Sequence, residues 1–271
     1  ANYLNVSRQS IQGLIKRKQV KVNGHEVKSA YLVQENDVIM IEDKEPNGEG
    51  ENIFSLKLDY LFEDDHVVVL NKPIGLIVHG SDEEQRLTLV DYLVQGGISL
   101  IGGKMTSRLG IVHRLDKMTE GLMVVTKSEL AYESLVSQFK NRQVEKEYVA
   151  MVHGNVSDDY LLIDRPILRH PSKRHLFCVH PEGKESITEV FVMNRFNTKT
   201  LCKVKPKTGR THQIRVHLSN LGYPILHDAQ YSDSSSGLGQ YLQASTLSFF
   251  HPKSGIKYIF RIPLSERLMR K

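Results

Sequence analysis

The sequence predicts an α+β protein with a small first unit and a larger second domain. Segments typical of strands outnumber those typical of helices, and the two kinds do not alternate regularly, which argues against a doubly wound parallel sheet. The stretch DKEPNGEGEN, residues 43–52, is acidic and has no apolar side chain apart from its proline, as is typical of a linker. We therefore place an α/β unit at residues 1–43, a linker at 44–53 and the larger domain at 54–271.

The first unit has the pattern of a basic helix followed by a hairpin. Ser7 is the expected N-cap of the helix, and an apolar face starts at Ile11. The pair Asn23-Gly24 is the strongest short hairpin signal, and ENDVIMIED, residues 35–43, supplies a last short strand. Some forty residues are too few for a sizeable core, so we interpret the unit as a compact binding module. Its cations are Arg8, Lys16, Arg17, Lys18 and Lys21.

The larger domain contains several strand patterns and two amphipathic helix patterns. The segment GLMVVTK, residues 121–127, is an apolar run with two valines, which predicts a buried strand. Further strands are expected at 66–73, 146–154, 186–196, 200–206 and 213–220, and helices at 88–97 and 128–141.

Composition limits the class of protein. Apolar residues make up 40% of the 271 residues and charged residues 25%, as in ordinary globular domains. No run approaches the roughly 18 apolar residues of a membrane span, and the N-terminal residues lack the apolar core of a signal peptide. Cys178 and Cys202 belong to no spaced motif, which predicts reduced thiols in a cytoplasmic protein.

The charge distribution points to a polyanionic partner. The net charge is +5, and two stretches contain cations and no acid: five Lys/Arg between Ser7 and His25, and seven between Val190 and His227. Solvated faces usually mix both signs, so two such stretches favour nucleic acid over chance clustering.

No motif for a cofactor or a metal is visible. GISLIGGKMT, residues 97–106, resembles a phosphate loop, but its first glycine is one position off and Met105 stands where Ser or Thr must hold the metal. There is no GxGxxG motif. His212 and His217 lie five apart on a predicted strand, so they would point to opposite faces. We expect neither metal nor cofactor.

Three groups of residues are candidates for chemistry, each with a plainer alternative. Asp116 follows Arg114 by two positions: this is either a weak local ion pair or a carboxylate kept ionised in a partly desolvated pocket, ready to act as nucleophile or base. Tyr148 is either a half-buried packing residue or a platform on which a base stacks. The donor-rich segment at 207–215 is either a polar strand end satisfied by solvent or a site for phosphates and bases. The residues alone leave each alternative open.

Taken together, these segments resemble the RluA-type pseudouridine synthases. GIVHRLDKMTEGLMVVTK resembles the family signature HRLDxxTSGL. VVVLNKPIGLIVH, EKEYVAMVHG and KTGRTHQIRVHLSNLGYPILHDAQY resemble the blocks NKPxGxxVH, KxYxAxVxG and TGRxHQIRxHL…GxPIxGD. The resemblance covers residues 55–264. It implies a pseudouridine-synthase fold, with a mixed, largely antiparallel central sheet and a catalytic cleft, and an isomerase that converts uridine in RNA to pseudouridine without a cofactor.

The resemblance also implies roles for individual residues. The signature aspartate of the family is catalytic, and here it is Asp116. Tyr148 is expected to stack on the flipped uracil, and Arg210 to pair with Asp116 and keep it ionised. Arg114 is expected to enter the space that the base leaves. The residues expected to contact RNA are Arg8, Lys16, Arg17, Lys18, Lys21, Arg114, His212 and Arg215.

The first unit resembles the S-four-type RNA-binding module, clipped at its N-terminal side because most of its usual first helix is absent before Asn5. In this family the module precedes the catalytic domain of enzymes that act on large-subunit ribosomal RNA. We therefore expect that RNA as the partner of a cytoplasmic monomer, with neither DNA nor a membrane involved. The alternatives are a transfer-RNA enzyme and a non-catalytic RNA-binding or ribosome-assembly protein on the same scaffold.

The sequence departs from the family pattern at four positions. Met118 and Glu120 replace a polar residue and the serine of the signature, His227 replaces a glycine, and Gln243 replaces a histidine. These departures bear on pocket contacts and substrate choice.

Overall fold

The structure is a computed structural model that describes residues 15, 19–41, 57–80, 87–102, 109–232 and 239–269. In the first unit, β1 (Val20–Val22) pairs in antiparallel fashion with β2 (His25–Glu26) and β3 (Ile39–Ile41). Asn23 and Gly24 both have positive φ angles, 51° and 82°, as the primed hairpin turn requires. The predicted hairpin is therefore confirmed. The predicted basic helix lies outside the described residues except for Ile15, which is helical.

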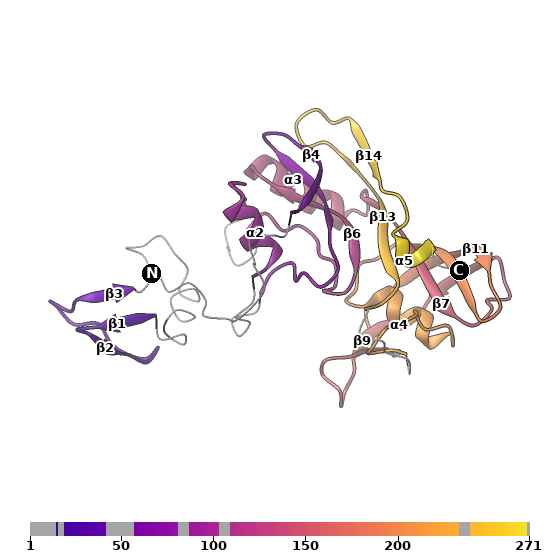
Figure 1. Cartoon of the computed structure of the whole chain (residues 1–271), viewed down its shortest axis with the longest axis horizontal. Helices are drawn as coiled ribbons and strands as arrows, with labels where there is room; N and C mark the ends of the chain where they lie inside the picture. The colour runs from indigo at the N-terminus through magenta and orange to yellow at the C-terminus, as the bar shows by residue number, and fades with distance from the viewer. Residues whose placement is uncertain are drawn as a thin grey trace.

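The described part of the larger domain is built on one mixed sheet of nine strands (Figure 1). The spatial order is β4-β5-β6-β13-β7-β12-β11-β8, and β14 also pairs with β13. All pairings are antiparallel except that of β6 with β13. The strands are β4 (Asp59–Glu63), β5 (Val67–Lys72), β6 (Glu120–Thr126), β7 (Glu145–His153), β8 (Tyr160–Asp164), β11 (Ile187–Arg195), β12 (Lys199–Pro206), β13 (Leu242–Phe250) and β14 (Lys257–Arg261). The predicted fold class is confirmed.

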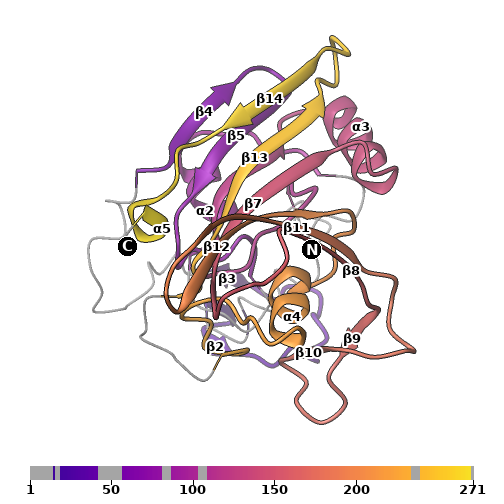
Figure 2. The same cartoon turned by 90° about the vertical axis from the view of Figure 1, so that its right-hand side faces the viewer.

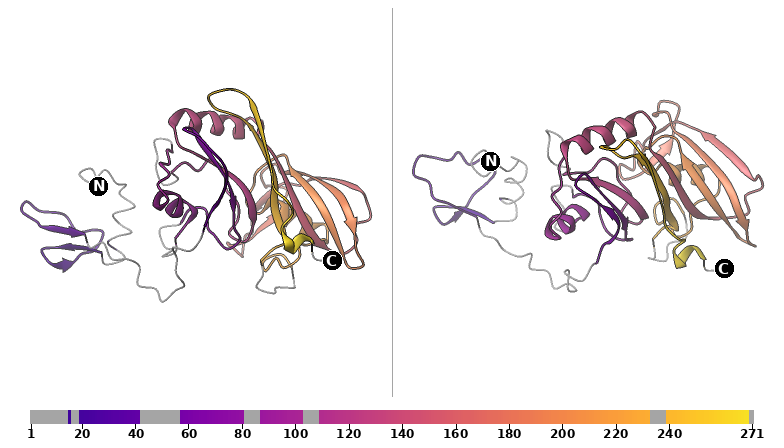
Figure 3. Two further views of the ribbon diagram at one scale, coloured as in Figure 1. Left: turned by 45° about the horizontal axis from the view of Figure 1, so that its top comes forward. Right: turned by 90° about the horizontal axis from the view of Figure 1, so that it is seen from above.

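Helices cover both faces of this sheet. They are α2 (Leu89–Gln95), α3 (Glu129–Lys140), α4 (Gln213–Asn220) and α5 (Glu266–Met269). Side chains alternate along β5: Val68 and Leu70 pack into the core that contains α2, whereas Val67 and Val69 pack into the core that contains α3. The two helices therefore lie on opposite sides of β4 and β5 (Figure 3).

Helix α4 covers the other half of the sheet, next to β11 and β12 (Figure 2). Beside it, β9 (Ile167–Arg169) and β10 (Phe177–Val179) form a separate antiparallel hairpin. α4 was expected as a strand, and that prediction is wrong. Ile214 and Leu218 face the core four residues apart, as in a helix, but every residue from 213 to 218 is buried. Full burial hides the period in the sequence, because apolar residues at 214, 216 and 218 imitate a strand pattern.

The centre of the sheet depends on a very short parallel contact. β6 and β13 pair through two positions only, Glu120 with Gln243 and Gly121 with Ala244. Gly121 has a φ angle of 120°, and a Cβ atom there would overlap the backbone of Ala244, so only glycine allows this approach. The contact fixes the start of β6, and with it the loop that carries Asp116, against the strands β13 and β7. None of the described helices is both long and apolar enough to span a membrane.

Candidate active site

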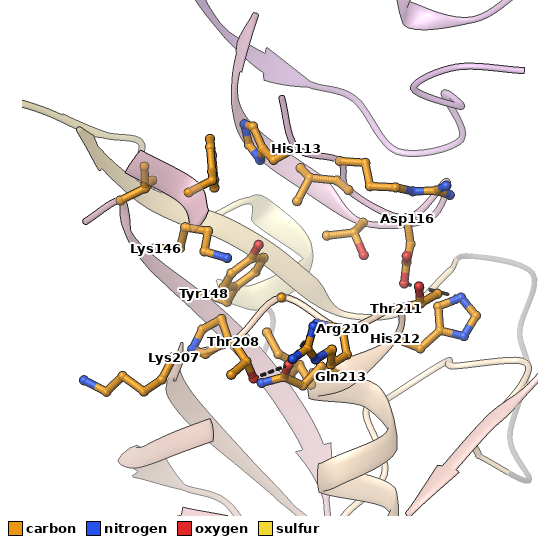
Figure 4. A pocket seen from close by; sticks show the side chains of 18 of the residues that line it. His113, Asp116, Lys146, Tyr148, Lys207, Thr208, Arg210, Thr211, His212 and Gln213 are labelled. Atoms are coloured by element: carbon orange, nitrogen blue, oxygen red, sulfur yellow. Dashed lines mark hydrogen bonds and ion pairs between the residues drawn. The ribbon is translucent and has the colours of Figure 1, made fainter. Parts of the chain in front are cut away.

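A cleft of about 590 Å³ lies between the loop that precedes β6, strand β7 and the segment that leads into α4 (Figure 4). Asp116 comes from the loop, Tyr148 and Lys146 from β7, and His212 and Arg215 from the start of α4. Segments that are up to a hundred residues apart in the sequence thus supply one cavity. The sequence predicted Asp116, Tyr148 and the segment at 207–215 as separate candidates, and the structure brings them together.

The carboxylate of Asp116 is held by a buried arginine. Nη1 of Arg215 lies 2.8 Å from Oδ2 of Asp116, and the same guanidinium binds Asp228 through two contacts of 2.7 and 2.8 Å. The Arg215 side chain is 5% exposed, Asp228 is fully buried and Asp116 is 22% exposed. Burial works to lower the pKa of Arg215, but Asp228 and Asp116 outweigh it and raise that pKa. The permanently charged Arg215 therefore holds Asp116 from the buried side, while the other side of the carboxylate remains open to the cleft.

This geometry corrects two expectations. Arg210 was expected to pair with Asp116, but its Nε donates to the carbonyl of Glu185 at 3.0 Å, and its side chain is exposed. Arg215 was expected to contact RNA, but it is buried among carboxylates and its fork is already bound. The reason is the helix: Arg215 lies in the first turn of α4 and points inward, whereas Arg210 lies in the exposed turn before it.

A buried lysine holds the Asp116 loop in place. Nζ of Lys72 donates to the carbonyl oxygens of Pro73, Leu76 and Lys117, at 2.8, 2.9 and 3.2 Å. Burial lowers the pKa of Lys72 to about 7, while the charges of Asp116 and Glu120 act to raise it. Since three carbonyl oxygens each require an N–H, the contacts suit the ammonium form. Lys72, the last residue of β5, thus connects this strand to Lys117, the residue next to Asp116.

Tyr148 forms the opposite wall of the cleft. Its side chain packs into the main core, and no described group makes a hydrogen bond to its hydroxyl. Burial and then the charge of Asp116 raise its pKa, so the phenol keeps its proton at neutral pH. The uncharged ring of Tyr148, beside the open carboxylate of Asp116, can stack on a planar base.

Lys146 and His113 lie deeper in the same wall. Burial lowers the pKa of Lys146, and its Nζ lies 6.0 Å from the centre of the Phe139 ring. The ring of His113 stacks on Phe139 with the ring centres 4.7 Å apart, and its Nε2 accepts a hydrogen bond from the backbone N–H of Val124 at 3.0 Å. Burial, followed by the charge of Lys146, lowers the pKa of His113 to about 3. His113 is therefore a neutral, structural side chain.

The side chain of Gln213 holds the turn before α4 through four hydrogen bonds. Its Oε1 accepts from the hydroxyl of Thr208 at 2.7 Å and from the backbone N–H of Arg210 at 3.0 Å, while its Nε2 donates to the carbonyl of Ile187 and the hydroxyl of Thr188, both at 2.9 Å. Gln213 thus uses all of its hydrogen-bonding groups. Gln213 thus fixes the turn that carries Arg210 and His212 to β11, and Thr208 adds a second contact, because its hydroxyl accepts from the backbone N–H of Ile187 at 3.0 Å.

The other predicted RNA-contacting residues divide into four groups. Arg114 is exposed and lines the cleft. His212 is mostly buried, and its Nε2 lies 3.8 Å from Oδ2 of Asp116. Lys21 is half-buried on β1. Arg8, Lys16, Arg17 and Lys18 lie outside the described residues.

Several cations of the second basic stretch, from Val190 to His227, are paired with acids in the structure. Lys205 pairs with Glu147 at 2.6 Å and Lys207 with Glu189 at 2.7 Å. Arg195 likewise pairs with Asp159 and Arg215 with Asp228. The fold thus brings an acid next to four of the seven cations of this stretch, although the stretch itself contains no acid.

The sequence did not point to three residues of the site: Lys72, Asp228 and Tyr231, whose hydroxyl lies 2.8 Å from Nδ1 of His212. The signal for Asp228 was present, because this aspartate belongs to the block GYPILHDAQY that carried the resemblance. Lys72 likewise belongs to the block VVVLNKPIGLIVH, but its burial could not be predicted, because lysines are almost always exposed. In the described residues, no group of three or more His, Cys, Asp or Glu is placed to hold a metal ion.

Comparison with known proteins agrees with the site. Residues 66–220 match the family model described as RNA pseudouridylate synthase, and residues 2–39 match the S4 domain. The chain is 40% identical over 262 residues to the uncharacterized RNA pseudouridine synthase YlyB of Bacillus subtilis, which covers 96% of this chain and 86% of that protein. It is 35% identical over 276 residues to ribosomal large subunit pseudouridine synthase D of Pseudomonas aeruginosa, with coverage of 96% and 85%.

A solved structure gives the same result. The chain superimposes on human RNA pseudouridylate synthase domain containing 4 with a TM-score of 0.62 at 26% identity, covering 78% of this chain and 90% of that one.

Proposed function

The chain belongs to the RNA pseudouridylate synthase family, and on that premise we propose that Asp116 is the residue that reacts with the ribose of a uridine bound in the cleft. One observation carries this proposal. Asp116 is the acid of the cleft that combines an open carboxylate oxygen, a buried cation at 2.8 Å and an aromatic wall across the cavity. Arg215 therefore orients this carboxylate and balances its negative charge before the substrate binds.

The proposed reaction is a rearrangement of the uridine, with no net gain or loss of atoms. The N1–C1′ bond breaks and its electron pair leaves on the uracil, which turns and forms a C5–C1′ bond. C5 then loses its proton and N1 gains one, so substrate and product are isomers. Asp116 either attacks C1′ or removes the proton from C2′ to release the uracil. Both routes need the carboxylate beside the ribose.

The cleft also supports a flipped nucleotide. A uridine in a stem must leave the base stack, which costs a few kcal/mol. Tyr148 offers a face on which the uracil can stack, and Arg114 at the exposed rim can fill the space left in the RNA. Because the pKa of Tyr148 is raised, its hydroxyl acts as a hydrogen-bond donor in this proposal, with stacking as its main contribution.

The target that we propose is large-subunit ribosomal RNA. Two features support it: the relatives named ribosomal large subunit pseudouridine synthase D, and the match of residues 2–39 to the S4 domain. We place the enzyme in the cytoplasm, as a monomer that acts on RNA and not on DNA. The unit boundaries at 43 and 54 remain predictions.

The test is pseudouridine mapping of naked cellular RNA after incubation with the purified protein, with and without EDTA. We expect new pseudouridines in large-subunit ribosomal RNA at the same rate in both conditions, because the chemistry is a rearrangement. Modification of transfer RNA alone would replace the proposed target. No pseudouridine in any RNA would contradict the activity, and loss on chelation with rescue by one metal would contradict the mechanism.

A further inference from the structure

His212 occupies a position beside Asp116 that its role in the fold does not explain. It is the N-cap of α4, but its side chain makes no capping hydrogen bond. Its φ angle is 55°, in the left-handed region that is unfavourable for residues other than glycine. The imidazole instead points into the cleft, where the side chain is 15% exposed (Figure 4).

A hydrogen-bond chain determines which nitrogen of His212 carries the proton. The hydroxyl of Tyr231 accepts from the backbone N–H of Phe177 at 2.9 Å and lies 2.8 Å from Nδ1 of His212. Because the Tyr231 hydroxyl already accepts from Phe177, we assign it as the donor to Nδ1, which leaves the proton of the neutral imidazole on Nε2. The rings of Phe177 and Tyr231 meet the imidazole edge-on at 5.5 and 5.6 Å and hold its plane.

The surroundings keep this imidazole neutral. Burial lowers the pKa of His212 to about 4, more than the nearby carboxylates of Asp116 and Asp228 raise it. The cations Arg215 and Arg114 lower it further. Burial also raises the pKa of Tyr231, so its hydroxyl keeps the proton that it donates.

The Nε2–H group lacks a hydrogen-bond acceptor from the described part of the chain. Oδ2 of Asp116 is 3.8 Å away, beyond hydrogen-bond distance, and it already accepts from Arg215. A fixed, neutral donor thus points into the space next to the reactive carboxylate. The exposed cations of the site, Arg114 and Arg210, are placed differently: they lie at the rim, where phosphates would be met.

We propose that Nε2–H of His212 donates a hydrogen bond to the 2′-hydroxyl of the target uridine, so that His212 selects ribose over deoxyribose. This rests on the proposed function, in which C1′ lies against Asp116. The 2′-hydroxyl is attached to the neighbouring carbon, and it can accept from Nε2 while its own proton turns to the carboxylate. A neutral donor suits a hydroxyl, and the 2′-hydroxyl is the group by which proteins distinguish RNA from DNA.

The experiment compares two short RNAs that contain a uridine modified by the wild-type protein and differ only in a 2′-deoxyuridine at that position. Single-turnover rates are measured for wild type, His212→Phe and His212→Gln. We expect the wild type to prefer the ribose substrate about tenfold or more. His212→Phe should lose most of this preference by slowing on the ribose substrate alone. His212→Gln keeps an N–H near the position of Nε2 and should retain part of it. His175→Phe, at an exposed position, should behave as wild type.

Several outcomes would overturn the inference. If wild type and His212→Phe show the same ribose preference, His212 does not read the 2′-hydroxyl, although the proposed function stands. If the wild type makes no pseudouridine at all, the proposed function itself fails. ¹⁵N NMR of the unmodified protein tests the tautomer without any substitution: a proton on Nδ1 would contradict the hydrogen-bond chain from Tyr231. Tyr231→Phe removes the hydroxyl that donates to Nδ1, so the proton should be free to move between Nδ1 and Nε2, and the ribose preference should fall.

Discussion

Arg215 and Asp116 form an ion pair of 2.8 Å across 99 residues of sequence, and the arginine is the buried partner. Two further hydrogen bonds, to Asp228, fix the orientation of the guanidinium that binds Asp116. The carboxylate of Asp116 is therefore held by an arginine that is itself fixed by Asp228, and the exposed Arg210 has no part in this contact.

Replacing Arg215 should impair both chemistry and folding. Arg215→Lys keeps the charge but loses the fork that binds Asp228 and Asp116 together, so we expect a loss of about 1–3 kcal/mol in stability and at least a tenfold slower single-turnover rate. The matched variant Arg210→Lys should change the rate less than threefold, because its site is exposed. Equal effects of the two substitutions, measured by urea unfolding and single turnover, would restore Arg210 as the partner.

The sequence could not show which of the two arginines, Arg210 or Arg215, pairs with Asp116. Both belong to the segment TGRTHQIR, and both carry the same charge. Only the helical turn at α4 separates an inward from an outward position, and the complete burial of residues 213–218 conceals that turn in the sequence. Strands such as β6 and the hairpin at Asn23-Gly24 were predicted correctly because local apolar runs and turn residues determine them.

Long-range electrostatics could not be predicted for the same reason. The stretch from Val190 to His227 contains seven cations and no acid, yet Lys205 and Lys207 meet glutamates of the adjacent strands β7 and β11. Sheet register decides which charges meet, and register depends on contacts far apart in the chain. Asp116 was predicted as a site residue from its motif, whereas its ion-pair partner Arg215 became visible only in the fold.

Lys72 should be more important than its distance from the substrate suggests. Lys72→Met keeps the volume but leaves three carbonyl oxygens without their donor, so we expect a loss of about 3 kcal/mol in the free energy of unfolding and a slower reaction through a displaced Asp116 loop. Lys127→Met removes a surface pair with Glu63 and should cost less than about 1 kcal/mol. If the two variants unfold at the same urea concentration, the proposed role of Lys72 is wrong.

Acid should destabilise the protein partly through His212. Its pKa is 6.5 as the unfolded reference and about 4 in the folded state, so between these values the unfolded chain binds a proton that the folded chain does not. The stabilisation is complete above pH 6.5 and is lost as pH falls towards 4. Between pH 7 and pH 5, His212→Gln should lose about 2 kcal/mol less than wild type in urea unfolding. Parallel losses in the two proteins would show that His212 is charged in the folded state.

Removal of residues 1–45 should leave a folded catalytic domain with weaker and less selective binding. The deletion removes five cations, so the slope of log affinity against log salt should become shallower by up to about 0.9 for each phosphate that these cations neutralise in the full-length protein. Slow modification of several uridines in naked RNA should continue, because the whole cleft lies after residue 110. A full-length variant with glutamine at Arg8, Lys16, Arg17, Lys18 and Lys21 separates charge from fold. Unchanged salt slopes and unchanged sites would show that residues 1–45 do not target RNA.

The most direct test of the account is single-turnover pseudouridine formation by Asp116→Asn, with Asp65→Asn, at an exposed position, as the control. The amide keeps the volume of the side chain but can neither attack C1′ nor accept the C2′ proton, while the surfaces that bind phosphates are unchanged. We predict that Asp116→Asn forms no pseudouridine yet binds RNA within a few-fold of wild type, and that Asp65→Asn matches wild type in both assays. Turnover by Asp116→Asn at the wild-type rate would contradict the account.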